Sequence, residues 1–130
     1  MCISNTRTES LKPNKKKYKV LLIQATQYSS GKGDLCKQNR IFLPGLAFPL
    51  FSAYTPDNWD VEIIIEVVEG IDFEKKYDLV GIGAMGHAVF RAMDIADEFR
   101  KKGVPVFFGG YMASIVPELV RVPICPSEFI

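Results

Sequence analysis

Runs of apolar residues mark four segments of the chain as predicted strands. The first, YKVLLIQA at residues 18–25, contains an uninterrupted apolar stretch, which is typical of a strand covered on both faces in a parallel sheet. The other three are DVEIIIEVV at residues 60–68, YDLVGIGAM at residues 77–85 and VPVFFGG at residues 104–110.

The clearest predicted helix lies between the third and fourth strands, at residues 87–103. Its small and apolar positions recur every three or four residues and form one face, opposite a charged one. The apolar face comprises Ala88, Val89, Ala92, Ile95, Ala96 and Phe99. Lys101 and Lys102 suit the negative end of the helix dipole, and Gly103 suits its C-cap.

Two further segments predict less regular helices. PGLAFPLFSAYT, at residues 44–55, has Pro44 in a favourable first turn, whereas Pro49 could kink or delay the helix. Because it is apolar on all sides, we expect it to be largely buried. ASIVPELV, at residues 113–120, predicts a short helix that Pro117 limits to its early turns.

The alternation of strands and helices predicts a three-layer α/β fold. Right-handed crossovers would give an open parallel sheet of the flavodoxin-like or Rossmann-like kind. EGIDFEKK, at residues 69–76, is too short for a regular crossover helix and predicts a turn or two. RVPICPSEFI, at residues 121–130, offers at most a short strand, so we expect a fragment truncated before a complete fifth strand.

The composition fits a single globular domain without a strong attraction for nucleic acid. Of 130 residues, 48% are hydrophobic and 24% charged, and the net charge is +1. No broad basic field is present, so we expect no nucleic-acid partner. Residues 1–17, which include most of KPNKKKYK, predict a flexible basic leader before a domain at residues 18–130.

We also expect no membrane partner and a cytoplasmic location. The longest uncharged run, residues 41–56, is too short to span a bilayer and is expected inside the protein, while the leader lacks the apolar core of a signal peptide. Cys2, Cys36 and Cys125 are far apart and show neither metal-binding nor disulfide spacing, as expected in a reducing compartment.

The loop after the first predicted strand, QATQYSSGKGD at residues 24–34, looks like a phosphate-binding loop but fits no nucleotide motif. A Walker loop needs glycine where Thr26 stands and a hydroxyl residue where Gly33 stands. A dinucleotide fingerprint needs glycine where Cys36 stands. ATQYSSG matches a flavin phosphate loop only in part, and the acidic residues of a response-regulator receiver are missing.

Three loops should meet at the carboxyl edge of the sheet, where open α/β folds bind ligands. They are residues 25–34, 83–88 and 109–113, and all three are rich in small residues. Their glycines would let a bulky planar ligand approach main-chain N–H groups, or would simply permit tight turns. A flavodoxin-like protein that binds FMN or another phosphate-bearing ligand, and a ligand-free interaction module, therefore remain alternatives. A free edge strand also makes a homodimer an expected partner state.

The order of these pieces resembles a known family. KVLLIQ, LPGLAFPLFSAY, WDVEII, YDLVGIGAM and IADEFRKKGVPVFFGGYMASIVPEL are similar to the cobalamin-binding domain at the N-terminus of many cobalamin-dependent radical SAM enzymes. The resemblance extends from Lys19 to Leu119. Its most specific part is the amphipathic helix, KGVPV and the strand that ends in GG before Pro-Glu.

The resemblance implies a cobalamin site at the glycine-rich edge. Related modules of mutases and methionine synthase carry Asp-x-His-x-x-Gly after the first strand, and no histidine stands there in this chain. The resemblance therefore implies base-off cobalamin without a histidine lower ligand. His87 could contact a corrin amide or face solvent, and Ser of the family's Ser-x-Leu region is replaced. The implied cofactor-binding residues are Thr26, Gln27, Tyr28, Gly83, Ala84, Met85, Gly86, His87, Gly109, Gly110 and Tyr111.

The resemblance also implies a catalytic partner domain. Radical SAM chemistry needs Cys-x-x-x-Cys-x-x-Cys for a 4Fe–4S cluster, and the three cysteines of this chain cannot supply it. The cluster and S-adenosylmethionine would belong to a missing C-terminal radical SAM domain, with methyl transfer as its reaction. By itself this chain would bind the corrinoid without catalysing a reaction.

Overall fold

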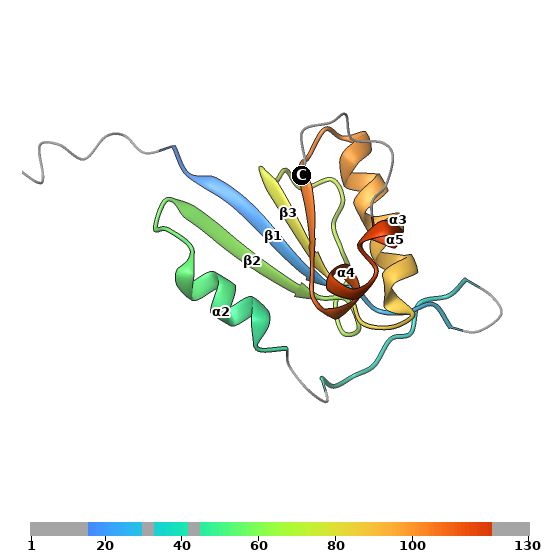
Figure 1. Ribbon diagram of the computed structural model, residues 1–130. Helices are drawn as coiled ribbons and strands as arrows, with labels where there is room; N and C mark the ends of the chain where they lie inside the picture. The colour runs from blue at the N-terminus through green and yellow to red at the C-terminus, as the bar shows by residue number, and fades with distance from the viewer. Residues whose placement is uncertain (1–15, 30–32, 42–44, 121–130) are drawn as a thin grey trace, which may run out of the picture.

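The protein forms an open sheet with helices on both of its faces. A computed structural model describes residues 16–29, 33–41 and 45–120. Its strands are β1 (Tyr18–Gln24), β2 (Trp59–Ile65), β3 (Leu79–Gly83) and β4 (Val106–Gly109). They lie in the order β2-β1-β3-β4, and every neighbouring pair is parallel (Figure 1). The predicted α/β fold with an open, flavodoxin-like parallel sheet is confirmed.

The four-residue run from Val20 to Ile23 in β1 is buried because this strand has neighbours on both sides and helices above and below. Val20 pairs with Val61 on β2 and with Leu79 on β3. Side chains alternate between the two faces of a strand, so a strand between two helical layers needs apolar residues at every position. This explains the uninterrupted apolar run in the sequence.

Helix α3 (Ala88–Lys101) covers one face of the sheet and forms the main core. All six residues of its predicted apolar face are buried, and they pack with Leu21, Ile23, Val80 and Ile82. Gly103 follows the helix with φ +75, a backbone conformation that glycine adopts without strain. The sequence therefore predicted this helix and its buried side correctly.

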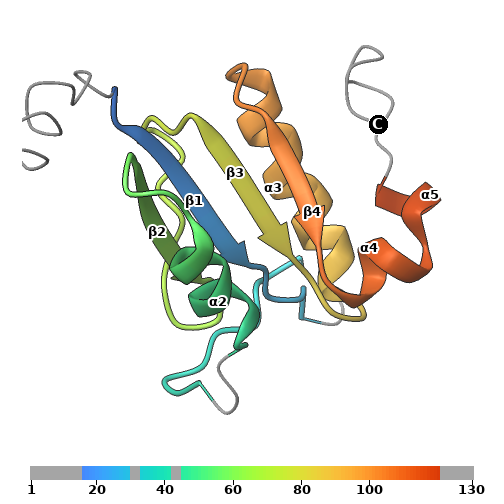
Figure 2. The ribbon, with the colours of Figure 1, turned by 60° about the vertical axis from the view of Figure 1, so that its left-hand side comes forward.

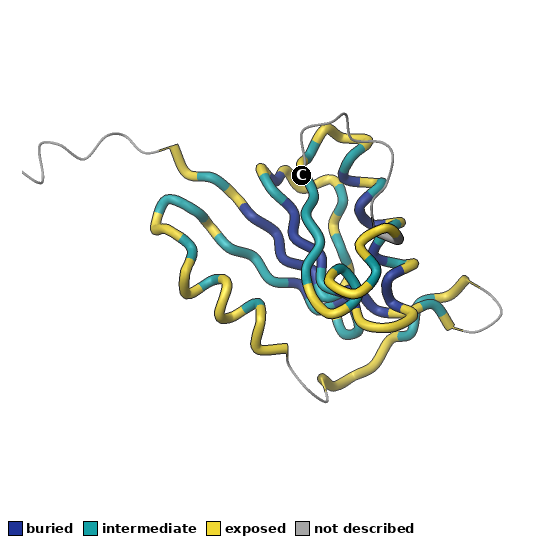
Figure 3. The backbone as a smooth tube through the Cα atoms, in the orientation of Figure 1, coloured by how far each residue is buried: buried dark blue, intermediate teal, exposed yellow. Residues whose placement is uncertain are grey.

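Helix α2 (Ala47–Tyr54) covers the other face of the sheet, as Figure 2 shows, but is not buried. The expectation of a largely buried helix was wrong, because no residue of α2 is buried (Figure 3). Leu46, its N-cap, and Tyr54, its last residue, are 80% and 83% exposed. Among the described residues this eight-residue helix alone covers its face of the sheet, so only one side of it meets the strands. A groove of about 520 Å³ remains beside Leu50. Pro49 falls in the first turn, where its missing N–H is not needed.

The element boundaries also differ from the sequence-based expectation. The second strand ends at Ile65 because Val68 N and Glu69 N turn back to Ile65 O, which closes a turn. The segment after β4 forms two helices, α4 (Tyr111–Ile115) and α5 (Pro117–Val120), and Pro117 opens the second instead of limiting the first. The expected basic leader, apart from Lys16 and Lys17, and the short strand at residues 121–130 lie outside the described residues.

A glycine in β3 allows aromatic packing on the α2 face. A Cβ atom at Gly81 would lie 2.3 Å from Phe107 Cζ and 2.8 Å from Leu22 Cδ2. The Phe107 ring thus lies over the bare backbone and stacks on Phe51 of α2, with ring centroids 5.7 Å apart. This stacking is one of the contacts that hold α2 against the sheet.

We predict that Gly81→Ala lowers the free energy of unfolding by about 1–3 kcal/mol, because the methyl group forces Phe107 and Leu22 to move. Urea denaturation measures the change. Gly70→Ala is the matched control: its Cβ would meet nothing within 4 Å, so it should leave stability within about 0.5 kcal/mol of the wild type. Equal stability of both variants would contradict the packing role of Gly81.

Candidate functional site

A cavity of about 440 Å³ opens at the carboxyl edge of the sheet, between the ends of β1 and β3. The chain leaves β1 toward α2 on one face and leaves β3 toward α3 on the other face (Figure 2). The two loops therefore diverge and leave a crevice between them. This is the switch point at which open α/β sheets bind ligands.

Seven of the eleven candidate residues line the cavity. They come from the loops after β1, β3 and β4, as expected from the meeting of the three loops, and are Thr26, Gln27, Gly83, Ala84, Met85, Gly110 and Tyr111. The structure therefore brings together candidates that are up to 85 positions apart in the sequence, from Thr26 to Tyr111. Met85 and Tyr111 are 75% and 65% exposed and stand at the rim.

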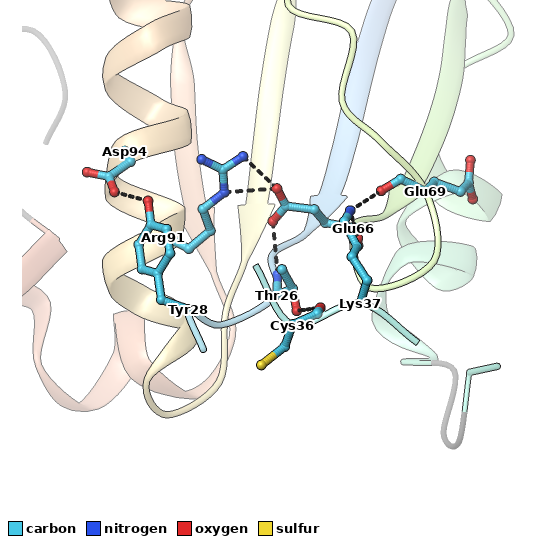
Figure 4. A network of polar contacts seen from close by, with 8 residues as sticks. All are labelled: Thr26, Tyr28, Cys36, Lys37, Glu66, Glu69, Arg91 and Asp94. Carbon is cyan, nitrogen blue, oxygen red and sulfur yellow. Dashed lines mark hydrogen bonds and ion pairs between the residues drawn. The ribbon is translucent and has the colours of Figure 1, made fainter. Parts of the chain in front are cut away.

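The other four candidates lie outside the cavity lining. Tyr28 points to α3, where its hydroxyl donates a hydrogen bond to Asp94 (Figure 4). Burial raises the pKa of Tyr28, and the bond to Asp94 raises it further, against an opposing effect of Arg91. His87 is exposed at the N-cap of α3, and Gly86 precedes it with φ +54.

Gly109 and Gly110 play different structural roles. A Cβ atom at Gly109 would meet nothing within 4 Å, so this residue borders empty space on the α2 face of β4. Gly110 has φ +93 and ψ −175, a conformation that is essentially restricted to glycine. The second glycine therefore serves the turn into α4, while the first leaves room beside the strand.

Among the residues that the structure describes, no charged side chain lines the cavity. The sequence-based list missed eleven of its residues, which come mainly from the loop before α2 and from α2 itself: Gln24, Ala25, Cys36, Gln38, Ile41, Gly45, Ala47, Phe48, Ile65, Val67 and Ala88. Three of the lining residues are glutamines, at positions 24, 27 and 38. Neutral amides, apolar groups and bare backbone therefore form the surface offered to a ligand. Because β1 and β2 are far apart in the sequence, the sequence alone did not show that residues of these segments line one cavity.

A buried ion pair that the sequence did not reveal supports the cavity. Glu66, which follows β2, is 1% exposed and faces Arg91 of α3 (Figure 4). Its Oε1 accepts hydrogen bonds from Arg91 Nε at 2.8 Å and Nη2 at 2.6 Å, while its Oε2 accepts one from Thr26 N at 3.1 Å. Burial lowers the pKa of Arg91, but bonding to Glu66 and Tyr28 outweighs this effect and raises it. The carboxylate thereby joins the loop after β1 to β2 and α3.

The same cluster fixes the far wall of the cavity. Thr26 Oγ1 donates to Cys36 O at 2.7 Å, and Gln38 N donates to Val67 O at 2.8 Å. Lys37 Nζ donates to Glu66 O and, at 2.6 Å, to Glu69 O. These bonds attach the loop before α2 to the end of β2. The described residues contain no group of three histidine, cysteine or acidic side chains that could hold a metal ion.

We predict that Arg91→Met lowers the free energy of unfolding by about 3–5 kcal/mol, because it leaves the buried Glu66 carboxylate without its cationic partner. Urea denaturation provides the measurement. The double variant Glu66→Met with Arg91→Met should recover most of the loss, since both charges are then absent.

Lys75→Met is the control for that experiment, because it breaks the Lys75–Glu62 pair, whose side chains are 44% and 40% exposed. Such an exposed pair should contribute little to stability. An Arg91→Met protein no less stable than this control would refute the structural role of the buried pair.

The comparisons with known proteins relate part of the chain to a methyltransferase. The chain is 36% identical, over 74 residues, to the bacteriochlorophyllide d C-8(2)-methyltransferase of Chlorobaculum tepidum. The match covers 56% of this chain and 16% of that enzyme, so the chain spans only a small part of its relative. No family model and no solved structure matches the chain. Within the described residues, no helix has the length and apolar character needed to cross a membrane.

Proposed function

We propose that this chain is the cobalamin-binding module of a methyltransferase. The observation that carries the proposal is the uncharged cavity at the switch point, with amide side chains and bare glycine backbone in its walls. The partial similarity to an enzyme whose name places a methyl group on a carbon of a bacteriochlorophyllide supports methyl transfer. When bound, the corrinoid would supply the methyl group to an acceptor carbon.

The residues present fit a corrinoid better than a nucleotide. The rim of a corrin ring carries neutral carboxamides, which can exchange hydrogen bonds with Gln24, Gln27 and Gln38 without any charge. A terminal phosphate such as that of FMN would be favoured by a cation, and no Lys or Arg of the described residues lines the cavity. The ring is too large for 440 Å³, so we propose that it stays at the mouth of the cavity and that only its side arms enter.

The space beside Gly83 and Gly109 suits the nucleotide arm of the cofactor. The two glycines pair across β3 and β4 on the α2 face of the sheet. Phe48 of α2 covers Gly83, where a Cβ atom would lie 2.9 Å from its ring, whereas Gly109 faces open space. We propose that the arm lies along this bare backbone, and that Met85 and Tyr111 contact the ring at the rim.

The histidine of the chain does not favour ligation of the metal. His87 is exposed and lies outside the cavity lining, and the loop after β1 brings Thr26 and Gln27 to the site instead. We therefore propose base-off binding without a histidine lower ligand. We further propose that a separate radical SAM domain holds the 4Fe–4S cluster and S-adenosylmethionine, and that this chain orients the corrinoid toward it.

Mixing the purified chain with hydroxocobalamin and desalting it tests the proposal. The protein should retain corrin absorbance, and it should retain no FMN in a parallel trial. A protein fraction without corrin absorbance would refute the proposed function.

Gly109→Val tests the proposed path of the nucleotide arm. Valine fits a strand and has free space here, so stability should stay within about 1 kcal/mol of the wild type, while cobalamin affinity should fall at least about tenfold because the space is filled. Gly70→Val is the matched control, since its Cβ is equally unobstructed and Gly70 lies in the segment between β2 and β3, outside the Gly83–Gly109 pair where the arm is proposed to lie. Spectroscopic titration measures both affinities. Equal cobalamin affinity of the Gly109→Val and Gly70→Val proteins would contradict the proposed path of the nucleotide arm.

A further inference from the structure

Gln24 carries a buried acceptor that nothing in the described part of the chain satisfies. Its Oε1 is shut off from solvent and has no hydrogen-bond partner there. A buried polar atom without a partner destabilises a fold, because it has lost its hydrogen bonds to water and has formed none within the protein. Such atoms are few in folded proteins, and each one calls for a physical reason.

The neighbours of Gln24 explain why the fold leaves it unpaired. Gln24 ends β1 at the centre of the sheet, where it pairs with Ile65 on β2 and Gly83 on β3. Neither neighbour has a polar side chain. On the remaining side, a Cβ atom at Gly45 would lie 3.5 Å from Gln24 Oε1, so that contact is with bare backbone. The strand neighbours of Gln24 therefore offer its amide no polar side chain, and the amide is held on a strand at the centre of the sheet.

The same side chain lines the cavity at the switch point. A half-turn about its Cγ–Cδ bond exchanges the amide oxygen and nitrogen, so Gln24 can offer either an acceptor or a donor to a bound group. A ligand that donates a hydrogen bond to Gln24 Oε1 removes the free-energy cost of leaving this acceptor unpaired. Binding is then favoured by an interaction that the free protein lacks.

We infer that Gln24 is a specificity-determining residue that hydrogen-bonds a carboxamide of the bound ligand and rejects a carboxylate at that place. The inference rests on the proposed corrinoid function. A carboxamide has both a donor and an acceptor to match Gln24, whereas an ionised carboxylate only accepts. Within the described part of the chain no cation lines the cavity to neutralise a carboxylate, so its desolvation would go uncompensated.

The test uses cobinamide, a corrinoid that keeps the ring carboxamides and lacks the nucleotide arm, and the variant Gln24→Met, which keeps the length of the side chain. Titration followed by absorbance should show at least a tenfold loss of affinity. Thermal unfolding without ligand should show no loss of stability, because methionine removes an unpaired acceptor. Lys76→Met, an exposed change outside the cavity lining, should alter neither quantity.

A second measurement needs no variant. Wild-type protein should bind cobinamide at least tenfold more tightly than the corresponding corrinoid with ring carboxylates. Equal affinity for the two, or unchanged cobinamide binding by Gln24→Met, overturns the assignment of Gln24 and leaves the proposed function standing. If the wild-type protein binds no corrinoid at all, the proposed function and this inference fall together.

Discussion

The site depends on one buried carboxylate. Glu66 accepts hydrogen bonds from Arg91 of α3 and from the backbone of Thr26, so a single side chain joins the end of β2, the loop after β1 and the helix beneath them. A buried charge is costly unless it is paired and fully hydrogen-bonded, and this one is. Because three elements share it, none of them can move at the carboxyl edge without disturbing the others. The hydrogen bonds of Glu66 therefore hold the cavity walls in position.

The two faces of the sheet differ in how firmly they are covered. The α3 face carries a continuous core, whereas the α2 face is held by aromatic rings that lie over glycines. Glycines in β3 and β4 remove side chains where a ligand arm would need space, and Phe48 takes up part of that space above Gly83. A firmly packed layer thus supports the site from below, while a lightly packed helix borders it. Such an arrangement suits a module that admits a large cofactor from one side.

The chemistry of the cavity is consistent with the proposed role in binding. Uncharged walls favour a neutral, amide-rich surface over a free phosphate, and the unpaired oxygen of Gln24 gives one position that a ligand would complete. Stability and binding are then in partial conflict at Gln24, as is common at functional sites. The partial similarity to a methyltransferase supports the proposed role in methyl transfer. The match covers 16% of that enzyme.

The sequence by itself determined the strands, the buried face of α3 and the glycine-rich edge, because each depends on local periodicity or on residues adjacent in the chain. Only the tertiary structure decided that Glu66 meets Arg91, that Gln24 Oε1 has no partner among the described residues and that Tyr28 turns away from the cavity toward Asp94. Those contacts join residues 25 to 66 positions apart or depend on which side chains surround an atom. It also decided that α2 is exposed, since an apolar helix is buried only where enough neighbours are present to cover it. The hydrophobic pattern of a segment shows which residues it can bury. The tertiary packing decides which of them are buried.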